Sequence, residues 1–195
     1  ESFSDICGEL KKIIPFDRAC LITSNEQGQW FQVFALTKNY NFSEINEGEC
    51  FPISGSLLEE IIKTGEPVIV NNTQTGRFWT DRVLYKERIH ARLGFPLTYK
   101  GKVLGALTFG SEKSNSFSEQ CYYYLWQLAP QLAIALENTK LFNRIKASEE
   151  RYKTLFNHAA DSMVMIDLNG KILTVNQREE EIIGYKMEEL LGKYI

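Results

Sequence analysis

A helical repeat of apolar residues covers the stretch from about Phe117 to Asn157. Residues three and four positions apart lie on one face of a helix, and two neighbouring apolar stripes follow that spacing. The first stripe is Cys121, Leu125, Leu128, Leu132, Ala135, Thr139 and Phe142. The second stripe is Tyr122, Trp126, Ala129, Ala133 and Leu136. The stretch predicts one long helix over 117–157 with more apolar surface than a single neighbour needs.

A wide apolar face can serve two neighbours at once. We expect one stripe to pack on a preceding sheet and the other on a partner helix with a heptad-like repeat. This predicts a homodimer. The dimer-helix residues are Leu125, Leu128, Leu132 and Phe142. Ser116 and Glu119 have capping-box spacing at the start of the helix. Pro130 removes one backbone hydrogen bond, so a bend is expected there before the helix resumes.

The residues before this helix alternate between helix and strand signals. Apolar residues at Phe3, Ile6 and Leu10 fit a helix that Pro15 ends. Two strand pairs are expected, FDRACLITSN with WFQVFALT and RLGFPLTY with KVLGALTFGS. Gly101 can take the positive φ that the second turn needs. Gly105 inside the last strand indicates a close approach of another backbone.

A capped helix and a short strand lie between these strand pairs. Ser56 and Glu59 have capping-box spacing, and Gly65 occupies the place of a left-handed C-cap. The residues VIV at 68–70 then predict a short buried strand.

Residues 71–91 show no clear period and carry Phe78, Trp79 and His90. A long connection with aromatic residues is often functional. These three residues are therefore candidates for lining a ligand pocket. The alternative is that the aromatic side chains close the edge of the core, and composition does not separate the two.

The last part of the chain carries a second strand signal. The residues SMVMIDLNGKILTVNQ predict a hairpin in which Asn169 and Gly170 both take positive φ. Residues 177–191 predict short helices. This part supplies a hairpin but few further strands, so it is expected to need cover from elsewhere.

The order of elements resembles the GAF family over residues 1–143. The strings that carry the resemblance are ISGSLLEEIIKTGEPVIVNN, LGFPLTYKGKVLGALTFGS and FSEQCYYYLWQLAPQLAIALENTKLF. It implies an α+β fold, in which a central antiparallel sheet is flanked by helices. GAF domains usually bind small molecules or serve as dimerisation modules.

Residues 149–195 resemble the start of a PAS domain. The resemblance rests on SEERYKTLF, on the hairpin with DLNGKI, on Asn176 and on the ending GYKMEELLG. A typical PAS domain continues with a further helix and three strands, so the PAS-like part is incomplete. Together the resemblances imply a sensory input region of a signalling protein, such as a sensor histidine kinase or a cyclic-dinucleotide enzyme.

Specific GAF chemistries find little support in the residues. Cyclic-nucleotide-binding members carry an acidic pair where this chain has Cys121 and Tyr122 after Phe117. Bilin-binding members attach the chromophore to a cysteine, and residues 71–91 contain none. His90 could ligate haem iron, but a lone histidine is more often a hydrogen-bonding residue. No metal site is expected, and the identity of any cofactor stays open.

Composition and charge limit the classes of function that the chain can have. The net charge is −3 without a basic run, which disfavours direct nucleic-acid binding. No apolar run approaches the roughly 20 residues of a membrane helix. We expect a cytoplasmic, non-enzymatic part of a longer protein, which could be anchored in a membrane elsewhere. The alternatives are a ligand-free dimerisation module and a methionine-sulfoxide reductase, which would need a low-pKa thiol with a resolving partner.

Overall fold

The computed structural model describes residues 3–25, 27–40 and 43–194. The chain forms two compact units, residues 1–137 and residues 138–195. We call them the first unit and the second unit. Within the described residues, no helix combines the length and apolar character needed to cross a membrane.

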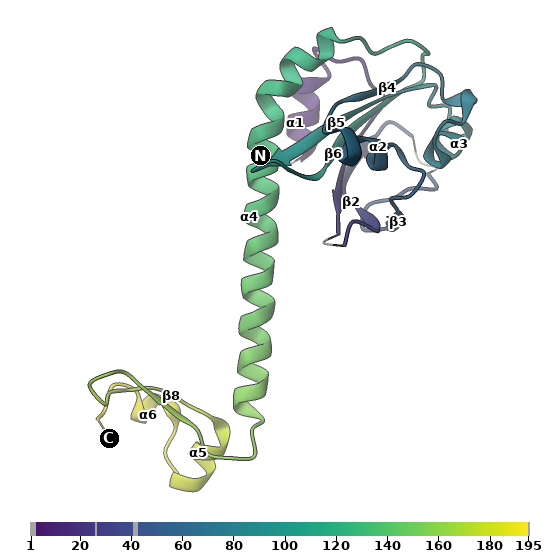
Figure 1. The fold of residues 1–195 in the computed structure, drawn as a ribbon. Coiled ribbons are helices and arrows are strands. Elements are labelled where there is room, and N and C mark those ends of the chain that lie inside the picture. The colour runs from purple at the N-terminus through teal and green to yellow at the C-terminus, as the bar shows by residue number, and fades with distance from the viewer. Residues whose placement is uncertain (1–2, 26, 41–42, 195) are drawn as a thin grey trace. The chain divides into compact units, whose positions relative to one another are not determined.

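The first unit is built on a six-stranded antiparallel sheet with the strand order β3-β2-β1-β6-β5-β4 (Figure 1). The strands are β1 (Arg18–Ser24), β2 (Trp30–Lys38), β3 (Cys50–Pro52), β4 (Val68–Val70), β5 (Ala91–Tyr99) and β6 (Lys102–Ser111). The two predicted strand pairs are present, and β1 pairs with β6 to join them. Sequence patterns missed β3, because three residues are too few to show alternation. These elements confirm the expected α+β fold.

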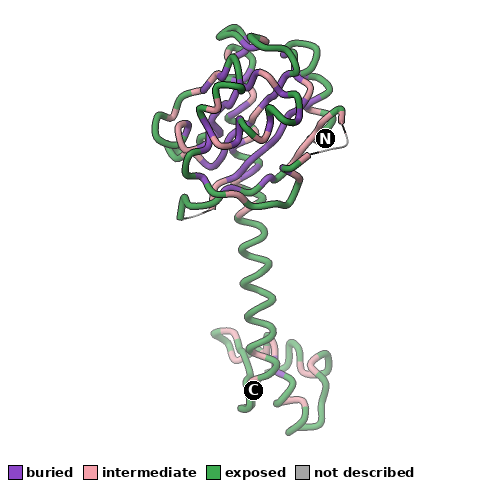
Figure 2. Tube along the Cα trace, turned by 90° about the vertical axis from the view of Figure 1, so that its right-hand side faces the viewer, coloured by how far each residue is buried: buried purple, intermediate pink, exposed green. Residues whose placement is uncertain are grey.

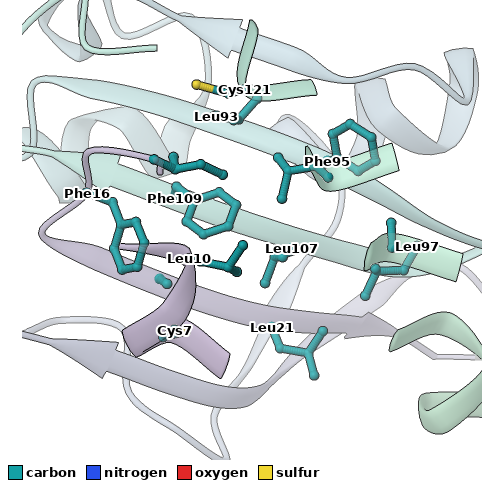
Figure 3. Close-up of a cluster of buried hydrophobic side chains, with 14 of the residues drawn as sticks. Cys7, Leu10, Phe16, Leu21, Leu93, Phe95, Leu97, Leu107, Phe109 and Cys121 are labelled. Carbon is teal, nitrogen blue, oxygen red and sulfur yellow. The ribbon is translucent and has the colours of Figure 1, made fainter. Parts of the chain in front are cut away.

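Helices cover both faces of the sheet. Helix α1 (Phe3–Leu10) and the first part of α4 (Gln120–Asn157) cover one face, and α2 (Leu57–Thr64) and α3 (Trp79–Lys86) lie on the other (Figure 1). The apolar core is accordingly divided into two clusters. Figure 3 shows the first cluster, in which the rings of Phe16 and Phe109 lie 5.1 Å apart between centroids.

Several local predictions are confirmed at single residues. Lys100 and Gly101 have φ values of 48° and 77°, which closes the β5–β6 hairpin tightly. A Cβ added to Gly105 would lie 2.0 Å from the carbonyl oxygen of Ile22, so the close backbone approach is real. Gly65 ends α2 in the left-handed conformation at φ 72°.

The capping of α2 differs slightly from the expected box. The Ser56 hydroxyl accepts a hydrogen bond from the Glu59 amide at 3.4 Å, as predicted. The Glu59 carboxylate instead accepts from the amide of Gly55 at 2.7 Å, one residue before the expected donor. Both bonds still satisfy amides at the start of the helix.

The segment 71–91 is ordered into a 3-10 turn over Thr73–Thr75 and the helix α3. The prediction of an irregular connection was therefore wrong. Helix α3 has only eight residues, which is too short to show a clear period. The helix is held mainly by ion pairs with charged residues on strands outside it, Arg18 on β1 and Arg92 on β5. Partners outside the helix produce no recognisable pattern in the residues of the helix itself.

The long helix is one continuous element of 38 residues that passes through Pro130. It begins at Gln120, three residues later than predicted. The Ser116 hydroxyl bonds to the Ser111 hydroxyl at 3.0 Å and to the Lys113 carbonyl at 2.6 Å. This makes the predicted capping box with Glu119 wrong.

The second unit contains the end of α4, a two-stranded hairpin and two short helices. The strands are β7 (Val164–Ile166) and β8 (Ile172–Val175), and the helices are α5 (Gln177–Ile183) and α6 (Met187–Leu190). The turn departs from the prediction, since Gly170 has positive φ and Asn169 does not. The Asp167 carboxylate closes the loop instead by accepting from the amides of Asn169 and Lys171 at 2.8 and 2.9 Å.

Candidate functional site

Helix α3 is fixed at its N-terminal end by a buried ion pair. The Asp81 carboxylate lies 2.6 Å from an Arg92 guanidinium nitrogen and accepts the Phe78 amide at 3.0 Å. The same guanidinium nitrogen donates to the Thr80 hydroxyl at 2.7 Å. Burial lowers the pKa of Arg92, and the adjacent Asp81 carboxylate opposes that change. The pair therefore holds α3 to β5.

A second buried pair fixes the C-terminal end of α3. The Glu87 carboxylate accepts from Arg18 at 3.0 Å, from the Tyr40 hydroxyl at 2.8 Å and from the Ser43 hydroxyl at 2.9 Å. Arg18 also donates to the carbonyl of Ile45 at 3.1 Å. Removing one member of such a pair leaves an uncompensated buried charge. Helix α3 is thus held to the sheet at both ends.

Two of the three predicted site residues open this helix. Phe78 is buried, and Trp79 packs its ring against Phe31 and Phe51 at centroid distances of 6.3 and 5.9 Å. The indole nitrogen of Trp79 is buried, and among the described residues it has no hydrogen-bond partner. An unpaired buried donor costs free energy, so this N–H is a natural anchor for a hydrogen-bond acceptor.

His90 is placed apart from Trp79, beyond the C-terminal end of α3. Its ring packs edge-on against Tyr85 with centroids 5.2 Å apart. Its amide donates to the Ser111 carbonyl at 2.7 Å, and its carbonyl accepts from Thr73 at 2.9 Å. His90 therefore contacts Tyr85 and the backbone next to β5. The ring contacts described for Trp79 are with Phe31 and Phe51 instead.

The four charged residues that hold α3 were missed by the sequence analysis. Arg18 stands at the start of the apolar run ACLI, and Arg92 stands inside ARLGFPL. A charge inside a buried strand requires a partner. That requirement was an available signal, but the sequence does not say where the partner lies.

All four cysteines are free thiols, of which Cys50 is exposed and Cys7, Cys20 and Cys121 are buried. Burial raises the pKa of Cys7 and of Cys20 to about 11 in each case. Both remain protonated at neutral pH, and a protonated thiol is a poor nucleophile. In the described part of the chain, no group of three or more His, Cys, Asp and Glu residues could hold a metal ion.

The face of α4 that enters the core combines residues of both predicted stripes: Cys121, Leu125, Ala129, Ala133 and Leu136. Leu125 is 0% exposed inside the first core cluster. Its assignment to a dimer seam is therefore wrong, because a second chain cannot reach it. Leu128 and Leu132 are half-buried against the same cluster. Phe142, in the second unit, is 67% exposed.

Further along α4, a regular row of side chains is exposed in the described chain. We call it the outer stripe: Leu141, Ile145, Ser148, Tyr152 and Leu155. The spacing alternates between four and three residues, which is the heptad repeat of coiled coils. Figure 2 shows the exposure of this part of the helix, in contrast to the buried residues of the first unit.

Comparisons with known proteins agree with this architecture. The GAF domain family matches residues 1–137, and the PAS fold matches residues 150–195. The methyl sulfide methyltransferase-associated sensor of Methanosarcina acetivorans is 27% identical over 133 residues, which cover 66% of this chain. The match spans only 13% of that protein's own length.

Solved structures share the fold of the first unit. The GAF domain of a two-component sensor histidine kinase from Bacillus halodurans has a TM-score of 0.61 at 21% identity, covering 73% of this chain and 98% of that one. The type II free methionine-R-sulfoxide reductase of Thermoplasma acidophilum has a TM-score of 0.54 at 14% identity, covering 66% and 85%. The chain belongs to the GAF family, and a PAS fold follows its GAF domain.

Proposed function

We propose that this chain is a sensory input region in which the GAF unit binds a small molecule, pairs with a second copy and passes its state through α4 to the PAS-like unit. The observation that carries the proposal is α4 itself. Its first part is buried in the GAF core, and the same uninterrupted helix continues to Asn157, inside the segment that matches the PAS fold. An output domain in the longer protein, of the histidine kinase or cyclic-dinucleotide type, would receive the signal.

The outer stripe is the proposed dimer seam, in place of Leu125. Two helices that bury such a heptad row against each other form a coiled coil. Charge favours a parallel pair, because Arg144 and Glu149 flank the stripe at the positions that meet between parallel helices. In an antiparallel pair, Arg144 would instead approach Arg151 of the second copy.

Light scattering at micromolar concentration tests the seam. The double variant Ile145→Glu/Tyr152→Glu puts like charges into the stripe, so we expect the wild-type dimer to become a monomer. The matched control Asn143→Glu/Ala147→Glu adds the same charge on the opposite face and is expected to stay dimeric. A monomeric wild type would contradict dimerisation. A dimer that survives the stripe variant would contradict the seam.

The aromatic group at the start of α3 is the proposed ligand anchor. Its support is the buried, unpaired indole N–H of Trp79 beside Phe31 and Phe51. Native mass spectrometry of the purified chain should detect a bound small molecule. Trp79→Phe keeps an aromatic ring but removes the N–H, and should lose that mass. If neither protein carries a ligand, the ligand-free dimerisation module becomes the better description.

The alternative of a methionine-sulfoxide reductase is supported only by similarity of fold. The raised pKa values of Cys7 and Cys20 argue against a reactive thiolate at either residue. We expect no turnover of free methionine sulfoxide by the purified chain in the presence of a thiol reductant.

A further inference from the structure

The second unit has a polar residue at its centre. Val175 and Asn176 are the buried residues among those described in this unit, and Asn176 is 0% exposed. Its neighbours on the hairpin are apolar yet exposed, including Met163 and Leu173. A buried amide is stable only if its hydrogen-bonding capacity is used, so the partners of Asn176 determine how this unit is held together.

The side chain of Asn176 makes four hydrogen bonds, the full capacity of its oxygen and its NH₂ group. The oxygen accepts from the amides of Met163 at 2.9 Å and Glu179 at 3.0 Å. The nitrogen donates to the carbonyls of Phe156 at 3.1 Å and Asp161 at 2.9 Å. Phe156 lies in α4, Asp161 and Met163 lie in the connection before β7, and Glu179 lies in α5.

Two of these bonds serve the ends of two different helices. Glu179 lies in the first turn of α5, and its amide donates both to the side chain and to the carbonyl of Asn176, the N-cap of that helix. Phe156 lies in the last turn of α4, where backbone carbonyls are likewise left without intrahelical donors. One side chain therefore joins the end of α4 to the start of α5.

The other two bonds tie the same amide to the connection that leads into the hairpin, at Asp161 and Met163. Met163 directly precedes β7, and its carbonyl also accepts the Asn176 amide at 3.0 Å. Asn176 itself directly follows β8. A second contact between α4 and the hairpin is the bond from the Tyr152 hydroxyl to the thioether of Met165, which is exposed and uses a weak acceptor.

We propose that Asn176 is the joint that couples α4 to the PAS-like unit. When the last turn of α4 rotates, shifts or frays, the Asn176 amide must either move the hairpin and α5 with it or lose buried hydrogen bonds. The partners of Asn176 all lie within residues 138–195 and none of them belongs to the outer stripe, so the joint does not rest on the ligand or on the dimer seam.

A non-additivity experiment on the full chain tests the joint by hydrogen exchange. Thr154→Gly loosens the last turn of α4 at an exposed position outside the outer stripe, and Thr154→Ala is its matched helix-forming control. The glycine destabilises the helix by about 1 kcal/mol, roughly a fivefold change in opening. We expect amides at 163–166 and 172–175 to exchange about fivefold faster in the glycine variant.

The same comparison is repeated with Asn176→Asp. Aspartate keeps the two acceptor bonds and the N-cap of α5, but sets a carboxylate oxygen against the Phe156 and Asp161 carbonyls. With the joint broken, Thr154→Gly should no longer change exchange in the hairpin. Asn176→Ser, which also lacks the NH₂ group, provides a second background if the aspartate variant is unfolded.

Two results would overturn the proposal. Hairpin exchange that does not change with Thr154→Gly in the wild-type background would show that α4 and the hairpin are not coupled. An equal acceleration in wild-type and Asn176 backgrounds would show that coupling runs through another contact, such as the one between Tyr152 and Met165.

Discussion

The buried pair of Asp81 and Arg92 allows a quantitative test of how α3 is held. Asp81→Asn keeps the shape of the side chain but leaves Arg92 as a buried cation that keeps its hydrogen bond to the Thr80 hydroxyl. Arg92→Met removes the cation and leaves the Asp81 carboxylate with the Phe78 amide. Breaking a buried pair in this way costs about 3–5 kcal/mol.

The double variant gives the decisive number. It removes both charges, and replacement of a whole buried pair by neutral residues is often close to neutral in free energy. The two single losses add to roughly 6–10 kcal/mol, so a double variant that loses about 2 kcal/mol implies a strong coupling energy. The summed single losses are comparable to the whole free energy of unfolding of a typical domain, about 5–15 kcal/mol.

Urea unfolding followed by tryptophan fluorescence is a suitable assay. The chain has three tryptophans, Trp30, Trp79 and Trp126, and all lie in the first unit. The signal therefore reports on the unit that contains the pair. Losses that simply add in the double variant would refute the argument, since they would mean that the two charges do not compensate each other.

Further predictions address other parts of the chain. Gly105→Ala should lower the free energy of unfolding by more than about 3 kcal/mol, because the added Cβ would meet the Ile22 carbonyl. Gly94→Ala should lower it by about 1–2 kcal/mol, because its Cβ meets the flexible ends of Leu57 and Ile61. Urea unfolding compares the two variants. The pKa of Cys20 is about 11 against an ordinary 9, so the unfolded thiol loses its proton first and stability falls as pH rises from 9 to 11. Wild type should therefore lose roughly 2 kcal/mol more than Cys20→Ala between pH 8 and 10.5, and an equal loss would contradict the assignment. Calorimetry should show no micromolar binding of cyclic AMP or cyclic GMP, since Cys121 and Tyr122 replace the acidic pair of nucleotide-binding relatives. Amides at 163–175 should exchange faster than those at 103–109, because β7 is exposed and the central strand β6 is largely buried; strong protection of the hairpin in a verified monomer would refute this.

The candidate site was predictable only in part. Phe78 and Trp79 stood out as aromatic residues in a long connection, and the structure places them together at the start of α3. His90 lay close in sequence but belongs to a different contact, against Tyr85. The polar anchors of α3 were not found, because Asp81 and Arg92 are joined only when the chain folds.

The sequence by itself determined the features that depend on near neighbours. The left-handed end of α2 at Gly65, the turn at Lys100 and Gly101, and the continuous course of α4 follow from residues within a few positions of each other. Glycine conformational freedom and helical periodicity act at that range. The family resemblances also follow from ordered local strings.

Tertiary structure decided which faces are covered and which polar groups meet. The sequence showed two apolar stripes on α4, but only the packed sheet buries Leu125 and leaves Ile145 exposed. It likewise marked Asn176 as a family residue without showing that its amide joins α4, the hairpin and α5. Burial and hydrogen-bond partners depend on segments far apart in the chain, and such distances in sequence carry no periodic signal.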